Sequence, residues 1–312
     1  MMSFLNVGKI IKKILDIIIF PYLFFLSIVY FYISKRNKLV GFNFDSFGKR
    51  ISWRYLKKIK INKFIRLFLN PVSITRYFEF DYAFKNINKK EEIRVLDISS
   101  PRLFSMYINY YIKNIEYYMT NPDADDLNES IEYSKLLDLD NIKFMNLNVL
   151  SLPFESNYFD YIIMISVLEH IPDPHDIASI KALWKLLKVN GKLIITFPVA
   201  NNYFEEFRKN NTYKSKDIKK SDKGYFFQRF YDYNKIVERI LKPLFLESID
   251  NFEIFGEKEI NFFKEYISRW IKKGYCETIK DPLYILRQYK YFNSFNELVD
   301  TGVAGLVLTK SN

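Results

Sequence analysis

The segment from Leu147 to Pro198, "LNVLSLPFESNYFDYIIMISVLEHIPDPHDIASIKALWKLLKVNGKLIITFP", decides the fold of this chain. Within it, Phe159–Ile165 is almost wholly apolar, which is typical of a strand buried on both faces of a parallel sheet. Ile177–Leu187 has helical spacing, and Asn190-Gly191 marks its exit. Lys192–Phe197 has the pattern of a second strand. A strand, a helix and a strand in this order predict a βαβ unit.

The same alternation continues on both sides of that segment. Further strands are predicted at Ile93–Ile98, Glu116–Thr120, Ile142–Leu147, Leu244–Phe255 and Ala304–Leu308, and further helices at Leu103–Ile112 and Asp125–Leu137. The polar stretch from Asn201 to Lys223 is expected to be a loop, and Glu259–Tyr291 contains helical patterns. The pattern predicts an α/β fold with an open, mostly parallel sheet of seven strands and helices on both faces.

Ordered motifs in the central segment resemble those of class I S-adenosylmethionine-dependent methyltransferases of the type 11-like kind. They are Leu152-Pro153-Phe154, Phe159-Asp160, Leu168-Glu169-His170-Ile171-Pro172-Asp173-Pro174, Leu187-Lys188 and Gly191. The resemblance covers residues 93–200 and extends to "GVAGLVLTK", where this family places a reversed hairpin. It implies a Rossmann-like domain over residues 91–312, acceptor-side insertions at about 201–232 and 257–300, and S-adenosylmethionine as the cofactor.

The chain departs from the family where the cofactor would bind. The resemblance implies that Asp97 ends the first strand and that a glycine-rich turn follows, but Ser99, Ser100 and Pro101 stand there instead. Glycine serves in such a turn because the backbone approaches the ligand closely and adopts positive φ. Where the family has an acid that meets the ribose, this chain has Asn121, with Asp123 two residues further on. Where the family has an acid that meets the adenine, this chain has Asn148.

These departures leave two interpretations, loss of the cofactor and a rebuilt site, and we favour the second. Pro101 can occupy the first turn of a helix with Ser100 as its N-cap, so that hydroxyls and a helix N-terminus face the cofactor's carboxylate. Asparagine at both other positions keeps hydrogen-bonding capacity. The cofactor-binding residues expected from the resemblance are Asp97, Ser99, Ser100, Asn121, Asp123, Asn148, Val149, Ser166 and Glu169.

Methyl transfer to a hydroxyl needs a group that takes up the hydroxyl proton. His170, at the end of the fourth strand, is the candidate base; alternatively, Glu169 and His170 position the adenosine of the cofactor. The candidate acceptor-binding residues are Asn201, Tyr203, Tyr225, Arg229 and Tyr231. Arg229 can clamp a phosphate through two hydrogen bonds, or else it is a surface residue packed against a strand.

The positive charge of the chain is concentrated at its N-terminal end. Residues 1–66 hold 14 Lys and Arg against two acids, whereas the whole chain has a net charge of +11. Within that region, "IIIFPYLFFLSIVYFYIS" gives 18 residues without a charge between Asp16 and Lys35. That length is near the lower limit for crossing about 30 Å of hydrocarbon.

Three interpretations of this segment remain open: a spanning anchor, an anchor lying in the membrane plane, and a helix packed on the domain. Residues 1–40 are assigned to an anchor, residues 41–90 to a basic helical connector, and membrane contact to residues 10–66. Ser52–Asn70 alternates basic and apolar residues at helical spacing, which suits either a solvated helix or one resting on anionic headgroups. The basic residues downstream would keep the following domain on the cytoplasmic side.

Cysteine and histidine are too scarce for some other functions. Cys276 is the single cysteine and His170 and His175 the only histidines, so neither a disulfide framework nor a zinc site is expected. Nucleic acid is not the expected partner. The sequence favours a membrane-associated O-methyltransferase acting on a sugar hydroxyl of a nucleotide-sugar, lipid-linked glycan or polysaccharide precursor, because it is similar to methyltransferases of surface-polysaccharide pathways. The alternatives are a lipid or quinone methyltransferase and an inactive, membrane-tethered binding protein.

Overall fold

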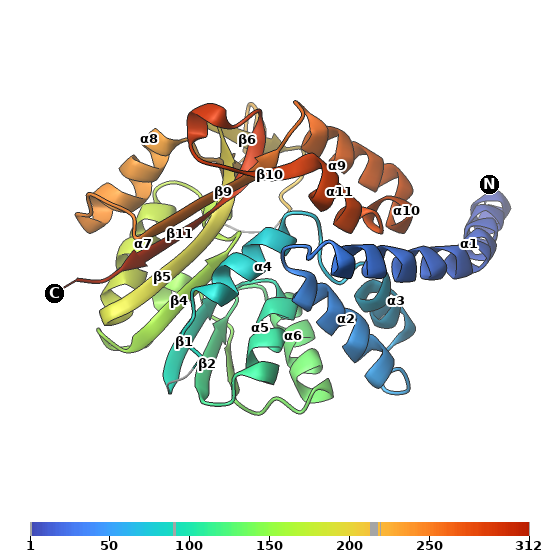
Figure 1. The fold of residues 1–312 in the computed structure, drawn as a ribbon, viewed down its shortest axis with the longest axis horizontal. Coiled ribbons are helices and arrows are strands. Elements are labelled where there is room, and N and C mark those ends of the chain that lie inside the picture. The colour runs from blue at the N-terminus through green and yellow to red at the C-terminus, as the bar shows by residue number, and fades with distance from the viewer. Residues whose placement is uncertain (1, 90–91, 213–217, 219, 312) are drawn as a thin grey trace. The chain divides into compact units, whose positions relative to one another are not determined.

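The structure is a computed structural model that describes residues 2–89, 92–212, 218 and 220–311, with side chains described from residue 19 onward. The chain divides into two compact units (Figure 1). Unit 1 comprises Met1–Tyr77 and Phe263–Arg287, and unit 2 comprises Phe78–Phe262 and Gln288–Asn312. Part of the predicted acceptor-side insertion at 257–300 therefore belongs to unit 1.

Unit 2 is built on a sheet of eight strands in the order β10-β9-β11-β5-β4-β1-β2-β3 (Figure 1). The strands are β1 (Ile93–Ile98), β2 (Ile115–Thr120), β3 (Ile142–Met145), β4 (Phe159–Ile165), β5 (Leu187–Ala200), β9 (Asn251–Glu257), β10 (Tyr289–Phe292) and β11 (Thr301–Thr309). The prediction of seven strands is wrong by one. The extra strand is β10, which has only four residues and follows directly on a stretch with helical periodicity.

The direction of the strands places a ligand site at one edge of this sheet. Strands β5-β4-β1-β2-β3 are parallel, and β11 lies antiparallel between β5 and β9, as the implied late hairpin requires. The chain order reverses between β1 and β4, because β2 and β3 lie to one side of β1 and β5 lies beyond β4. Open α/β sheets bind their ligands at the carboxyl ends of strands at such a point.

Helices cover both faces of the sheet, as predicted. The helical segments of unit 2 are α4 (Arg76–Lys85, which starts at the unit boundary), α5 (Arg102–Tyr111), α6 (Ala124–Leu136), α7 (His175–Leu186), α8 (Tyr233–Ile236) and the short turns η1 (Val149–Ser151), η2 (Leu168–His170), η3 (Val237–Leu241), η4 (Lys242–Leu244) and η5 (Phe295–Glu297). Ile98 of β1 shares a buried core with Leu183 of α7. Asp97, the residue before Ile98, points to the other face of the sheet, where Ser105 of α5 donates a hydrogen bond to its carboxylate.

Helix α4 is held against the sheet by a close approach at Gly305 of β11. A β-carbon at Gly305 would lie 2.4 Å from ring atoms of Tyr82, so only glycine leaves room for that ring. The Tyr82 hydroxyl donates a hydrogen bond to the carbonyl of Asn251 at 2.9 Å. These contacts fix the position of Glu79, one turn earlier on the same helix.

The stretch predicted to be a loop between Asn201 and Lys223 instead contributes to a second sheet. Strands β6 (Phe204–Arg208), β7 (Lys220–Ser221) and β8 (Gly224–Phe230) pair antiparallel in the order β6-β8-β7. The rings of Phe204 and Phe230 stack at 4.5 Å between centroids, and such cross-strand aromatic pairs stabilise a hairpin. The charged residues of β6 and the two-residue length of β7 concealed this strand pattern in the sequence. Residues 213–217 and 219 lie outside the described part of the chain.

Unit 1 is helical. Its helices are α1 (Met2–Arg36), α2 (Phe42–Arg54), α3 (Ile61–Leu69), α9 (Phe262–Lys273), α10 (Tyr275–Thr278) and α11 (Asp281–Gln288). The predicted helix over Ser52–Asn70 is in fact two, since α2 ends at Arg54 and α3 begins at Ile61. Leu23 of α1, Phe68 of α3 and Ile279 after α10 share one buried apolar cluster. Within the residues whose side chains are described, no helix is both long enough and apolar enough to cross a membrane.

Candidate cofactor and acceptor site

Asp97 is the last but one residue of β1, one residue before the strand ends at Ile98, and its carboxylate organises the turn that follows. The side chain is completely buried. Its oxygens accept hydrogen bonds from the Ser100 backbone N–H at 2.9 Å, the Ser105 hydroxyl at 2.8 Å and the Tyr117 hydroxyl at 2.5 Å. Burial raises the pKa of Asp97, although these donors oppose that shift. Asp97 therefore stabilises the backbone of the turn from within the core.

The turn after β1 keeps a glycine-like backbone without glycine. Ser99 has φ +53°, in the left-handed region that non-glycine residues rarely occupy. Ser166, directly after β4, has φ +49°. Both lie at the carboxyl ends of the two strands that flank the reversal of chain order. Left-handed backbone at non-glycine residues is costly and clusters at functional sites.

Ser100 does not cap the following helix, which corrects one expectation. Helix α5 begins at Arg102 after Pro101, and no side chain caps it. The Ser100 hydroxyl instead accepts a hydrogen bond from the Ile165 backbone N–H at 3.3 Å. It thereby ties the turn after β1 to the end of β4.

Glu79 of α4 is a buried acid at this edge of the sheet that the sequence interpretation missed. Its side chain is fully buried, and its Oε1 accepts hydrogen bonds from the Ser166 hydroxyl and, at 2.8 Å, from Thr196 of β5. Ile165, the last residue of β4, and Thr196 are register partners, so the carboxylate lies at the carboxyl end of β4, beside β5. The available signal was an acid placed between Phe78 and Phe80 in a helix rich in aromatic residues.

The residues expected at the ribose are engaged within the protein. Asn121 is buried; its amide donates to Asp126 at 2.8 Å, and its oxygen accepts from the Asp123 N–H at 2.9 Å. Asp123 caps α6 by accepting from two backbone N–H groups. Arg102, which follows the altered glycine turn, also bonds Asp126 and so joins the starts of α5 and α6.

The residues expected at the adenine lie in the turn after β3. Asn148 is exposed, and its side-chain oxygen accepts a hydrogen bond from the Leu150 N–H at 3.1 Å. Val149 starts the same turn and packs into the core beside β1. Both side chains follow β3, at the same edge of the sheet as Asn121, which follows β2.

His170 lies at the end of the turn after β4, where the sequence places a candidate base. Its Nδ1 is 2.7 Å from the carbonyl oxygen of Phe227 in β8. Because a carbonyl only accepts, Nδ1 carries the proton, and Nε2 carries the lone pair in the neutral ring. The Glu169 carboxylate is buried, with Oε1 3.7 Å from Nε2.

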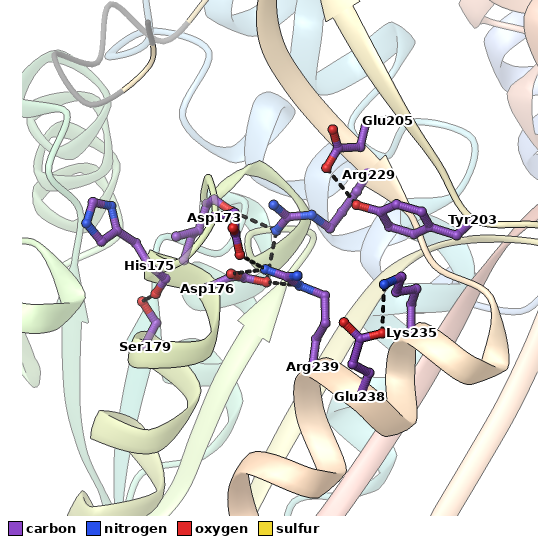
Figure 2. A network of polar contacts seen from close by, with 11 residues as sticks. Asp173, His175, Asp176, Ser179, Tyr203, Glu205, Arg229, Lys235, Glu238 and Arg239 are labelled. Atoms are coloured by element: carbon purple, nitrogen blue, oxygen red, sulfur yellow. Dashed lines mark hydrogen bonds and ion pairs between the residues drawn. The ribbon is translucent and has the colours of Figure 1, made fainter.

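Arg229 is buried and is used inside the protein, whereas the packing alternative placed it at the surface. It is 1% exposed, and its Nη1 donates to the Ile171 carbonyl at 2.7 Å and pairs with Asp176 at 3.1 Å. Arg239 bonds both oxygens of Asp176 and also Asp173 (Figure 2). Arg239 lowers the pKa of Asp173. Strand β8 thus holds the turn after β4 through His170 and through Arg229.

The other candidate acceptor residues lie between β5 and β6, in β8 and directly after β8. The Tyr203 hydroxyl donates to Glu205 at 2.6 Å (Figure 2), and burial together with this carboxylate raises the pKa of Tyr203 to about 12. Tyr231 is fully buried, and burial raises the pKa of its hydroxyl as well. Tyr225 is half-buried in β8, and Asn201 is bonded to the Leu298 carbonyl. Across the described residues, no group of three potential ligands could hold a metal ion.

Comparison with known proteins identifies the class. Residues 90–242 match a family model described as a methyltransferase domain. The crystal structure of MccD protein has a TM-score of 0.50 at 15% identity, covering 77% of this chain and 99% of that one. The [4+2]-cyclase SpnF scores 0.49 at 14% identity, covering 77% and 84%. Phosphoethanolamine N-methyltransferase 2 from Haemonchus contortus, in complex with S-adenosyl-L-methionine, scores 0.47 at 16% identity, covering 75% and 52%. The sequence matches no curated protein.

The sheet order, the reversal between β1 and β4 and the family match agree. Residues 90–242 therefore carry a methyltransferase domain. This agrees with the resemblance of the sequence motifs to class I S-adenosylmethionine-dependent methyltransferases, whose cofactor is S-adenosylmethionine.

Proposed function

We propose that this protein binds S-adenosylmethionine at the carboxyl ends of β1 and β4 and methylates a hydroxyl of a sugar. The acceptor sugar would belong to a nucleotide-sugar, a lipid-linked glycan or a polysaccharide precursor, reached at the cytoplasmic side of a membrane. The observation that carries the proposal is the left-handed backbone of Ser99 and Ser166. Decay of an unused site would relax such strained residues, whereas a binding site keeps them.

The residues around this backbone suit the charges of the cofactor. When bound, S-adenosylmethionine supplies an activated methyl group on a cationic sulfonium. The buried carboxylates of Asp97 and Glu79 make this edge of the sheet favourable for a positive charge. The first N–H groups of α5, which no side chain caps, favour a carboxylate.

His170 is suited to take up the proton of an acceptor hydroxyl. The Phe227 carbonyl fixes the ring with Nε2 as the basic nitrogen. Glu169 stabilises the imidazolium that forms after proton uptake, because its carboxylate lies 3.7 Å from that nitrogen. A hydroxyl acceptor needs such a base, whereas an amine that is already deprotonated does not.

One observation favours an inactive binding protein as the second candidate. The side chains of Asn121 and Asn148, which would meet the ribose and the adenine, are both engaged in hydrogen bonds within the protein. If those bonds persist, the nucleoside loses two of its expected partners. A lipid or quinone acceptor would change the substrate and leave the cofactor site as proposed.

Calorimetry with S-adenosylmethionine separates these candidates. We expect micromolar binding to the full-length protein and at least tenfold weaker binding to Asp97→Asn, since the turn that Asp97 holds would shift. Asp160→Asn is the matched control: Asp160 bonds Lys188 at the opposite end of β4 and should leave affinity unchanged. Absence of binding to folded wild-type protein at millimolar ligand would favour the inactive protein.

A second experiment tests the role of His170. With an acceptor found by screening sugars for transfer of a labelled methyl group, His170→Gln should lower kcat by about 10²- to 10⁴-fold with the affinity for S-adenosylmethionine little changed. His175→Gln is the control, because His175 only begins α7. A loss of cofactor affinity with unchanged kcat would instead assign His170 to positioning the adenosine.

A further inference from the structure

From Ile19 onward, where its side chains are described, helix α1 of unit 1 has a buried face and an exposed apolar face. Leu23, Ser27 and Ser34 are buried, and Leu23 packs in the cluster with α3. At helical spacing they define one side of the helix. The opposite side bears Tyr22, Phe25, Ile28 and Tyr32, exposed by 62%, 62%, 37% and 63%. We call these four residues the exposed stripe.

The exposed stripe ends in positive charge. Lys35 and Arg36 lie in the last turn of α1 and are exposed. They follow Tyr32 by three and four residues, which places them on the same side of the helix as the stripe. A second set of exposed cations lies in the turn between α2 and α3, at Lys57, Lys58 and Lys60. Trp53, next to this turn, is half-exposed and contacts the ring of Phe24 on α1 at 5.7 Å. Apolar rings and cations are therefore neighbours on unit 1.

Unit 1 as a whole is strongly basic. It holds 21 Lys and Arg against five Asp and Glu, a net charge of +16, which leaves −5 for unit 2. The C-terminal segment Phe263–Arg287 adds to this charge with six cations and three acids. The division of the chain thus separates a basic helical unit from an acidic sheet unit.

We propose that the exposed stripe of α1 is the docking surface of this protein for an anionic lipid bilayer, with the helix lying in the plane of the membrane. Tyrosine and phenylalanine side chains insert at the level of the headgroups, and flanking cations pair with anionic headgroups. The proposed function places the enzyme at a membrane, and this proposal names the surface that contacts the bilayer. It rests on unit 1 alone, so its failure would leave methyl transfer untouched.

Charge decides between a bilayer and a second copy of this chain as the occupant of the stripe. Two copies meeting through this face would bring together two units of +16 each, and like charges oppose that association. An anionic membrane surface attracts the same charge, by about fivefold in affinity for each cation near the surface. The complementary partner is therefore the lipid.

Sedimentation of the full-length protein with vesicles tests the proposal. We expect binding to phosphatidylcholine vesicles that contain phosphatidylglycerol and much weaker binding to phosphatidylcholine alone. Binding should fall when salt rises from about 0.1 M to about 1 M, because the screening length shrinks from about 10 to about 3 Å. Phe25→Ser should weaken binding about tenfold, and a triple change of Lys57, Lys58 and Lys60 to Gln about a hundredfold.

Phe245→Ser is the matched control, since Phe245 is 94% exposed but lies in unit 2. It should bind vesicles as the wild type does. Equal binding to both kinds of vesicle, or unchanged binding of Phe25→Ser, would overturn the proposal. So would a concentration-dependent dimer that Phe25→Ser abolishes while vesicle binding persists, because the stripe would then bind a second copy.

Discussion

Two buried polar networks in unit 2 flank the turn after β4, and they are built from different chemistry. On the cofactor side, Asp97 is met by a backbone N–H and two hydroxyls, none of which carries charge. On the acceptor side, Asp176 is met by the guanidinium groups of Arg229 and Arg239. The charge of a carboxylate that is held by neutral donors is not neutralised, so it can attract a cationic ligand. The charge of a carboxylate in an ion pair is neutralised within the protein. We therefore propose that the first network serves ligand binding and the second serves rigidity.

The largest effect should come from breaking the charged network. Asp176→Ala leaves Arg229, which is 1% exposed, without its counter-charge, and we expect a loss of about 3–5 kcal/mol in the free energy of unfolding. Asp173→Ala removes the exposed partner of the same Arg239 and should cost less than about 1 kcal/mol. Denaturant unfolding measures both. Equal losses for the two variants would break the comparison, because burial would then not distinguish the pairs.

An intermediate effect should come from the neutral-donor side. Glu79→Gln keeps an acceptor for Ser166 and Thr196 but removes the charge, so affinity for S-adenosylmethionine should fall about tenfold. Affinity for S-adenosylhomocysteine, which lacks the sulfonium charge, should change much less. Titration calorimetry of both proteins with each ligand measures how much the variant lowers the affinity for S-adenosylmethionine relative to that for S-adenosylhomocysteine.

The control for this variant is Glu253→Gln, a carboxylate paired with Lys85 at the other end of α4. It should bind both ligands as the wild type does. If Glu79→Gln weakens both ligands equally, Glu79 supports the fold of the site without sensing the charge of the cofactor.

How far the sequence predicted these regions depends on how local their signals are. Strands β1 and β4 were predicted to the residue, because an apolar run buried on both faces is visible in sequence. Strand β9 was placed too early, at Leu244–Phe255, because the apolar residues before Asn251 pack into the core without forming a strand. Periodicity reports burial, and it does not distinguish strand from irregular packing over so few residues.

The candidate site was predicted only in part for a related reason. Asp97 lies at the carboxyl end of β1 and His170 in the turn after β4, so their positions follow from the alternation of elements. Glu79 became a site residue only through Ser166 and Thr196, which lie 87 and 117 residues along the chain. No local pattern contains such a contact. The ion pair between Asp176 and Arg229 was missed in the same way, since β8 lay close to a stretch predicted to be a loop.

The smallest effect sharpens the comparison at the turn after β1. Ser99→Ala keeps the left-handed strain and loses the hydrogen bond from the Ser99 hydroxyl to the Thr120 carbonyl, whereas Ser99→Gly loses that bond but releases the strain. The glycine variant should therefore be more stable than the alanine variant by about 1 kcal/mol. At Ser100, whose φ is not positive, the order should reverse, because glycine there only adds freedom to the unfolded chain. The denaturant midpoints of the four variants show which of alanine and glycine is the more stable residue at each position. If alanine were the more stable residue at both positions, Ser99 would not hold the glycine conformation, and the cofactor turn would have decayed rather than been rebuilt.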